Sequence, residues 1–241
     1  MTPILISVSN ASSKVTDAEV QAAILALASQ LANDVAPIWG QVPALEFVPA
    51  GQVGTGCPCT ISDTPDQPGA LGYHDEGPDG KPYIKVFVVD GYDWVVTLSH
   101  EVLELTGNPA ANLWADAPDG SDYARELCDA VERDTYAKGG LNVSNFLYPA
   151  AFDPNAQPRE KLDHLGNLKA PFTMTSGGYE IHRTEPGATS QVFGHGATGT
   201  TPVHIGEGVH VVFSPGFPSE RIPATLKKAE RFKRGPRSST S

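Results

Sequence analysis

The feature that most constrains the fold is a nearly continuous apolar segment that carries three ionisable residues. Residues 93–106 read DWVVTLSHEVLELT, and Gly107-Asn108-Pro109 follow directly. Apolar residues occupy most sides of a helix drawn through this segment, and a helix that is apolar all round is buried. The Gly-Asn-Pro sequence is a typical helix stop. The segment therefore predicts a buried helix over 93–106.

The three ionisable residues of this helix indicate a metal site. His100 and Glu104 are four positions apart and share one face, whereas Glu101 lies about 100° around the axis. Burying carboxylates is costly unless they are paired, protonated or bound to a metal. One cation would relieve this cost for several groups at once. The alternative is a metal-free polar network on the same scaffold.

The pattern HExxE differs from the zinc motif HExxH by one ligand. In HExxH the two histidines hold Zn²⁺ and the glutamate activates water, so Glu101 is the candidate catalytic base here. Glu104 replaces the second histidine, and a carboxylate at that position can still ligate. Its hardness and charge weaken the specific case for zinc. We expect one divalent ion, with zinc as the first choice and calcium or manganese as alternatives.

A third ligand must come from another segment. The sequence predicts a second helix over 122–136, on which Glu126 and Asp129 are three positions apart. We expect Glu126 to complete the metal site with His100 and Glu104. Asp129 would be the outer partner that orients His100. His74 could lie near the site as a further ligand or a transition-state donor, although a histidine in a surface turn is the simpler interpretation.

The order of predicted elements indicates an α/β (α+β) fold with a mixed sheet around the metal-site helix. A helix is predicted from Ala18 to Val35, with Thr16 or Asp17 as its N-cap and with Pro37 and Gly40 at its end. A Gly/Pro/Asp-rich loop is predicted over 51–69. Strands are predicted at residues 3–8, 44–49, 70–74, 83–89, 179–183, 190–194 and 203–213. We expect a domain over 1–152, a β-rich C-terminal extension over 153–220 and a basic, disordered tail over 221–241.

Charge is distributed unevenly between the body and the tail. The net charge is −11, but residues 221–241 hold seven basic residues and one acidic residue, which leaves a net charge of −17 before position 221. An acidic body disfavours nucleic-acid binding and is compatible with cation binding. Only the tail could contact phosphates or an acidic partner. We also expect no signal peptide and no transmembrane segment, hence no membrane partner.

Three further groups of residues have weaker functional interpretations. Cys57, Cys59 and Cys128 lack the spacing of zinc knuckles, so we interpret them as reduced loop and helix residues. The pair His204 and His210 would face one side of a strand, where a second metal site is conceivable. The acidic loop of Asp116, Asp119 and Asp122 could bind calcium, although a solvated loop is the simpler interpretation.

The motif also resembles a known group of proteins. The pattern SHExxExxx[DN]P, a Trp-containing segment and then ExxD is similar to phage and bacterial zincin-like proteins and to the plant Exordium-like (phosphate-induced) family. The segments at 34–40, 72–75 and 143–152 also resemble the phage versions. The residues that carry the pattern are Ser99, His100, Glu101, Glu104, Asn108, Pro109, Trp114, Glu126 and Asp129.

This resemblance covers roughly residues 1–152 and implies a zincin-like fold with Gly72–His74 as the edge strand beside the metal helix. Asn108 stands where many relatives have Asp. The resemblance does not imply a proven peptidase. Two functions therefore remain: a virion-associated or assembly protein that uses the scaffold structurally, and an active metal-dependent peptidase. The first would have other virion proteins as partners, in the virion or host cytoplasm, and the second a peptide substrate.

Overall fold

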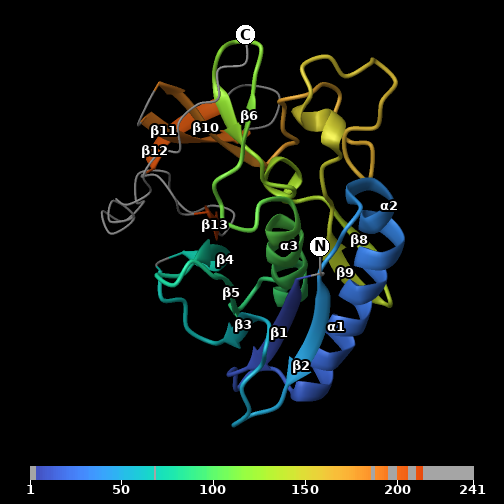
Figure 1. Cartoon of the computed structure of the whole chain (residues 1–241), viewed down its shortest axis with the longest axis vertical. Coiled ribbons are helices and arrows are strands. Elements are labelled where there is room, and N and C mark those ends of the chain that lie inside the picture. Colours follow the sequence, from blue (N-terminus) through green and yellow to red (C-terminus); the bar gives the residue numbers. More distant parts are fainter. Residues whose placement is uncertain (1–3, 68, 186–187, 195–199, 206–209, 214–241) are drawn as a thin grey trace.

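The fold is built around a six-stranded mixed sheet with two helices on one face (Figure 1). The computed structural model describes residues 4–67, 69–185, 188–194, 200–205 and 210–213. Strands β1, β2, β3 and β5 run parallel to one another, β4 pairs antiparallel with β5, and β13 pairs antiparallel with β4. In sheet order the strands are β13 (His210–Phe213), β4 (Ala70–Glu76), β5 (Pro82–Phe87), β3 (Cys57–Ser62), β1 (Leu5–Asn10) and β2 (Ala44–Val48). The predicted mixed α+β fold is confirmed.

The first helix begins as predicted but runs further. Thr16 caps α1 (Asp17–Gln30) in a capping box with Glu19. The chain continues through a π-helical segment, η1 (Leu31–Val35), into α2 (Ala36–Trp39). Pro37 was expected to help end the helix, but it sits in the first turn of α2, where proline is tolerated. Gly40, with φ of 79°, ends the run.

The helical run Asp17–Trp39 has the length and composition of a membrane span, with a mean hydropathy of 1.2 in its most apolar window. This is weak evidence, because the core helix of a soluble protein meets the same criterion. Val20, Ala23 and Leu27 of this run are buried in the core. Its packing is therefore compatible with a soluble protein.

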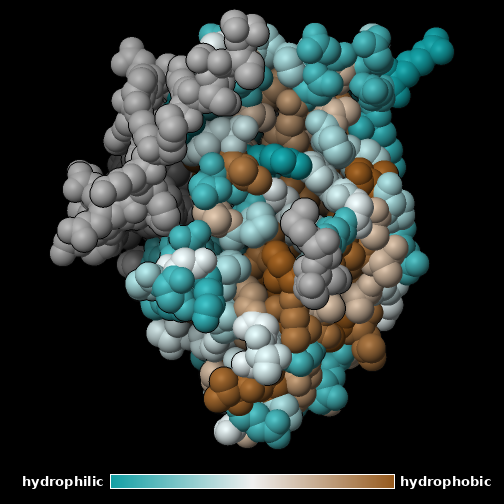
Figure 2. Space-filling model, viewed as in Figure 1, coloured by the Kyte–Doolittle hydropathy of each residue, from teal (hydrophilic) through white to brown (hydrophobic). Residues whose placement is uncertain are grey.

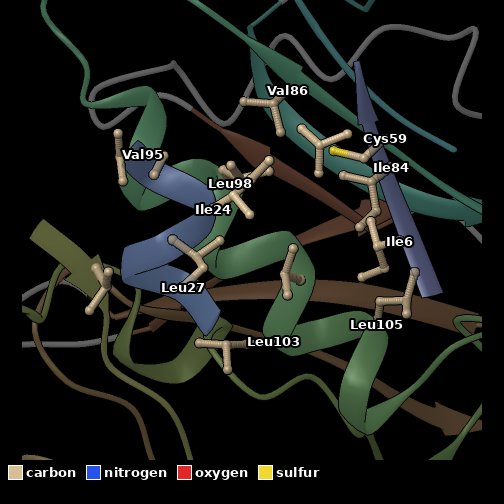
Figure 3. Packing of buried hydrophobic residues seen from close by; sticks show 14 of the residues in the cluster. Ile6, Ile24, Leu27, Cys59, Ile84, Val86, Val95, Leu98, Leu103 and Leu105 are labelled. Carbon is tan, nitrogen blue, oxygen red and sulfur yellow. The ribbon is translucent and has the colours of Figure 1, made fainter. Parts of the chain in front are cut away.

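The predicted buried helix over 93–106 is confirmed. Asp93 caps α3 (Trp94–Gly107) by accepting a hydrogen bond from the backbone N–H of Val95. Leu98, Leu103 and Leu105 of α3 are fully buried and pack with α1 and the sheet (Figure 3). Such burial contributes about 1.5–3 kcal/mol per large apolar side chain. The same packing holds the polar side chains of α3 inside the molecule.

The predicted helix over 122–136 is wrong. The segment forms β7 (Asp122–Ala124), a 3₁₀ turn η2 (Asp129–Val131) and β8 (Thr135–Lys138). Six consecutive residues, 126–131, are buried, so an amphipathic helix with an exposed face cannot form here. Their backbone finds tertiary partners instead: Leu127 O accepts from Leu147 N at 2.7 Å, and Ala130 O accepts from Thr175 N at 2.8 Å. Tertiary pairing overrides helix propensity in this segment.

The predicted loop over 51–69 is also partly wrong, because β3 forms inside it and contains both close cysteines. Cys57 and Cys59 are buried on the same face of β3, with Pro58 exposed between them. Cys128 directly precedes η2 rather than lying in a helix. All three thiols are free, as predicted, and burial raises the pKa of Cys57 to about 12.

The last third of the chain supplies strands to both sheets. The second sheet has the order β12 (Thr200–Ile205), β11 (Ala188–Gly194), β10 (Tyr179–Glu185), β7 and β6 (Trp114–Asp116). In contrast, β13 joins the first sheet and pairs with β4, with His210 opposite His74. The strand containing Gly72–His74 was expected at the edge, but among the described strands it is second in the sheet. The predicted tail over 221–241 lies outside the described residues, and the domain boundaries stay a prediction.

Two smaller elements complete the structure. Strand β9 (Leu141–Ser144) pairs with β8 and packs against α3, and η3 (Pro149–Phe152) follows. The face of the molecule shown in Figure 2 is a mosaic of hydrophilic and apolar residues. Large apolar side chains that are exposed include Leu25 and Val53, which are 72% and 93% exposed. Single exposed apolar residues of this kind are ordinary and indicate no interface.

Candidate metal centre

The α3 side of the site is formed by His100 and Glu104. His100 Nε2 lies 2.8 Å from Glu104 Oε1, on the same face of the helix, and 3.2 Å from Asp129 Oδ1. All three side chains are buried. Asp129 therefore lies beside His100, as the sequence predicted, although it reaches that place from η2 rather than from a helix.

The β4 side of the site is formed by His74, which is fully buried and not in a surface turn. Its Nδ1 lies 3.5 Å from Glu101 Oε2 and 3.5 Å from Glu104 Oε2. Its Nε2 lies 3.2 Å from the backbone oxygen of Asn108 and 3.9 Å from Glu126 Oε2. One imidazole thus connects the two glutamates of α3 with the segment that precedes η2.

Two overlapping groups of side chains could hold a metal ion, and they share Glu104. The first is His74, Glu104 and Glu126; the second is His100, Glu101 and Glu104. Within each group the potential ligand atoms lie within 4.8 Å of one another, and every side chain is buried. The structure therefore groups Glu126 with His74, whereas the sequence had grouped it with His100. The sequence underrated His74 because nothing in its local pattern shows that strand pairing carries it under α3.

Asn108 lies beside the candidate ligands, although the sequence analysis named it only as part of the helix stop and of the SHExxExxx[DN]P pattern, with no role in the site. Its Nδ2 donates to Glu126 Oε1 at 2.7 Å, and its Oδ1 accepts from the backbone N–H groups of Asn112 and Leu113, both at 2.9 Å. It is fully buried. The side chain therefore fixes both Glu126 and the turn after α3. The sequence signal that could have pointed to its role in the site was its position in the SHExxExxxNP pattern.

A second set of polar contacts fixes α3 against α1 and β9. Ser99 Oγ donates to Gln30 Oε1 at 2.8 Å and accepts from Ser144 N at 3.1 Å. Gln30 Nε2 in turn donates to Ser144 O at 2.9 Å. These buried hydrogen bonds connect α1, α3 and β9 next to His100. They orient the helix that presents the candidate ligands.

Burial and mutual charge shift the protonation of the cluster. Burial lowers the pKa values of His74 and His100, but neighbouring carboxylates, Glu104 among them, outweigh it and place both well above the usual value. Burial raises the pKa of Glu101 and of Asp129, and the charge of Glu104 adds to both shifts. The pKa of Glu104 is well below normal because His100 and His74 outweigh its burial. Protons thus offset part of the buried negative charge when no metal is bound.

Glu101 lies on the side of α3 that faces β4. Neither of its carboxylate oxygens makes a hydrogen bond of ordinary geometry within the described residues. Gly72 allows the close approach of α3 to β4, because a Cβ at this position would lie 2.6 Å from Thr97 Cγ2 and 3.1 Å from Glu101 Oε1. Glycine is required wherever two backbones approach so closely.

A small cavity lies beside the cluster, next to Glu126 and Asp129. Glu126 and Asp129 form part of its wall, together with residues of β7, η3, β10 and the loop at 172–173. Its free space is about 20 Å³, enough for roughly one water molecule. Of the cluster, Glu126 and Asp129 are thus the members that border this cavity.

Other candidate residues do not join the centre. Asp122 forms an ion pair with Arg183 at 2.8 Å, and Asp119 Oδ1 accepts a hydrogen bond from Ser121 N at 3.0 Å. Among the described residues, the groups that could hold a metal do not include this acidic loop. His182 packs against Tyr123 with ring centroids 5.5 Å apart. The side chains of His204 and His210 lie outside the described part of the structure.

Comparisons with protein-family models, curated proteins and solved structures gave no match. The resemblance to phage zincin-like proteins and to Exordium-like proteins therefore stays a prediction from the motif. The candidate centre has to be judged on its own geometry.

Proposed function

We propose that this protein binds one divalent metal ion through His74, Glu104 and Glu126, and that the ion stabilises a structural component of a phage particle. The observation that carries the metal proposal is the charge of the buried cluster. Four carboxylates (Glu101, Glu104, Glu126 and Asp129) surround two imidazoles, and all six side chains are at most 3% exposed. With all four carboxylates ionised, even two protonated imidazoles would leave a net charge of −2, so without a metal the cluster has to bind further protons.

No lysine or arginine side chain of the described residues forms an ion pair with Glu101, Glu104 or Asp129. Uncompensated buried charge is expensive, and a divalent cation would balance it. The ligand group His74, Glu104 and Glu126 also joins three separate segments, β4, α3 and the chain before η2. A metal there would hold these segments together, which is the property of a structural site.

The ligand chemistry suits zinc first. One imidazole nitrogen and two carboxylate oxygens are ligands that Zn²⁺ accepts, and Asn108 orients one of the two carboxylates from outside. Manganese accepts the same set. Calcium prefers six to eight oxygen ligands, so it fits less well.

A structural role is favoured over peptidase activity by what surrounds the centre. The candidate ligands are buried, and β13 pairs along β4 at Gly72–His74, next to the centre. An extended peptide that docks by strand addition would need that side of β4 to be open. The assignment to a phage particle, with other virion proteins as partners, is supported by the SHExxE…ExxD resemblance alone.

Elemental analysis of protein purified without chelator tests the metal proposal. We expect about one equivalent of zinc or manganese, with loss of most of it in His74→Ala and in Glu104→Ala. Glu76→Ala, at the end of the same strand β4, is the matched control and should keep the metal. Removal of the ion should lower the melting temperature, because a ligand of the native state stabilises it. Metal-free native protein would contradict the proposal, and loss in His100→Ala but not in His74→Ala would move the site to the second group.

The peptidase alternative is favoured by one observation, the unsatisfied carboxylate of Glu101 next to the proposed ligands. A general base in this position would make Glu101→Gln inactive while preserving metal content, with a rate loss of about 10²–10⁴. We expect instead no metal-dependent hydrolysis of a broad peptide library by the wild-type protein. Hydrolysis that disappears in Glu101→Gln would establish the enzyme.

A further inference from the structure

The second group of candidate ligands, His100, Glu101 and Glu104, belongs to a single element, α3. His100 and Glu104 are about one helical turn apart and Glu101 lies between them, so the helix itself brings the three side chains together. Their potential ligand atoms lie within 4.8 Å of one another, and all three side chains are at most 1% exposed. This group therefore needs neither β4 nor the segment before η2, whereas the proposed site of His74, Glu104 and Glu126 needs both.

Glu104 belongs to both groups, and its two carboxylate oxygens face different histidines. Its Oε1 lies 2.8 Å from Nε2 of His100, and its Oε2 lies 3.5 Å from Nδ1 of His74. A carboxylate placed in this way can bind two cations at once, one through each oxygen. The ions of two-metal sites in proteins lie roughly 3.5–4 Å apart, a distance that a bridging carboxylate spans. The two groups are therefore compatible with simultaneous occupation.

One ion in the proposed site leaves two carboxylates of the cluster without a cation. Glu101 and Asp129 are not ligands of that ion, and no lysine or arginine of the described residues forms an ion pair with either. Neither oxygen of the fully buried Glu101 makes a hydrogen bond of ordinary geometry within the described part of the chain. Asp129 Oδ1 lies 3.2 Å from Nε2 of His100, the nitrogen that also faces Glu104. Since buried carboxylates are costly unless paired, protonated or bound to a metal, a second cation would relieve both.

We propose that α3 binds a second divalent cation through His100, Glu101 and Glu104, with Glu104 bridging the two ions. This inference rests on the proposed function, because only an ion held by His74 makes Glu104 a bridge. Four carboxylates and two imidazoles are also the ligand inventory of the two-metal sites that hold iron or manganese in helix bundles. Carboxylate-rich ligand sets suit Mn²⁺, which is therefore the probe. The second ion should bind more weakly than the first, since two cations repel each other across the shared carboxylate.

Manganese titration of the full chain, after bound metal has been removed with a chelator, tests the second site. Equilibrium dialysis and elemental analysis should give about one equivalent at low Mn²⁺ concentration and about two at millimolar concentration. The electron paramagnetic resonance spectrum should change from that of an isolated ion to that of an exchange-coupled pair, because the shared carboxylate connects the two spins. Saturation at one equivalent, or a second equivalent without exchange coupling, would overturn the proposal.

Single-ligand variants assign each ion to its group. His74→Ala should bind about one equivalent, held by α3, and Glu101→Gln should bind about one, held at His74, with no exchange coupling in either. Glu160→Gln, an exposed carboxylate elsewhere, should still bind about two. Glu101→Gln keeps the volume of the side chain, so two coupled equivalents in this variant would refute the α3 site. The wild-type titration keeps the test decisive if a variant fails to fold.

The two proposals fail in different ways. If only the second site is wrong, the wild type binds one ion that His74→Ala loses and Glu101→Gln keeps. If the proposed site itself is wrong, the wild type binds one ion that His74→Ala keeps and Glu101→Gln loses, or it binds none.

Discussion

At the scale of single residues, Asn108 shows why an amide rather than a carboxylate can be required. It donates to Glu126 while its oxygen accepts two backbone N–H groups. Asn108→Asp would retain the acceptor, remove the donor and place a second carboxylate beside Glu126. We expect the metal-free protein to lose about 1–3 kcal/mol of unfolding free energy, since a buried acceptor loses its partner. Denaturant unfolding after chelation measures this loss.

The matched control for that prediction is Asn112→Asp, on the same turn, where only the backbone N–H of Asn112 takes part in the contact with Asn108. Its side chain is exposed, so the unfolding free energy should change by no more than about 0.5 kcal/mol. If Asn108→Asp were as stable as this control, the amide of Asn108 would not be the group that fixes Glu126.

The sequence singled out His100, Glu101 and Glu104 because ionisable side chains are costly to bury in a helix that is otherwise apolar. It could not favour His74 over a simple surface histidine as a site residue. His74 lies 26 positions before His100, and it is the pairing of β4 with β5 that brings it to α3. Contacts of this kind depend on strand register, and register is not visible in a local pattern.

At the scale of elements, the distance between α3 and β4 decides whether the candidate centre exists. A Cβ on Gly72 would lie 2.6 Å from Thr97 Cγ2 and 3.0 Å from the backbone oxygen of Lys85. Gly72→Ala should therefore push α3 away from β4 and separate His74 from Glu104. We expect a loss of about 1–3 kcal/mol in unfolding free energy, as in other overpacked cores, together with weaker metal binding. Thermal unfolding and elemental analysis measure both effects.

Gly77→Ala is the control, because the nearest atom to its added Cβ, Asp79 Oδ1 at 3.0 Å, belongs to a flexible exposed side chain that can move. It should keep the stability and metal content of the wild type. Retention of both by Gly72→Ala would mean that the helix and strand are not in the close contact on which the site depends.

Elements were predictable where local signals and burial agree. The apolar run and the Gly107-Asn108-Pro109 stop both indicated α3, and the helix is there, with Asp93 as its N-cap. The segment over 122–136 has helix-forming residues, yet its centre passes through the core with backbone groups bonded to distant segments. Local propensity cannot report such partners, so the sequence placed Glu126 and Asp129 on a helix, whereas Glu126 lies in the segment before η2 and Asp129 in η2 itself.

At the scale of the whole molecule, the strand β13 connects the end of the chain to the candidate centre. Its residues His210–Phe213 pair with β4, which contains His74. A truncation after Ile205 removes this strand and leaves the backbone groups of β4 without a neighbour on that side. A truncation after Glu220 keeps the strand and removes only the basic residues 221–241.

The two truncations should behave differently. Loss of residues 221–241 should change the melting temperature by no more than a few degrees, because that segment has few apolar residues to bury. Loss from residue 206 onward should lower it by about 5 °C or more, since each kcal/mol lost costs about 2–4 °C in a chain of this size. The unpaired strand β4 should also promote association, because a bare strand edge is a template for another chain. Thermal unfolding and light scattering over a range of concentrations measure both effects, and equal destabilisation by the two truncations would show that the tail itself packs on the protein.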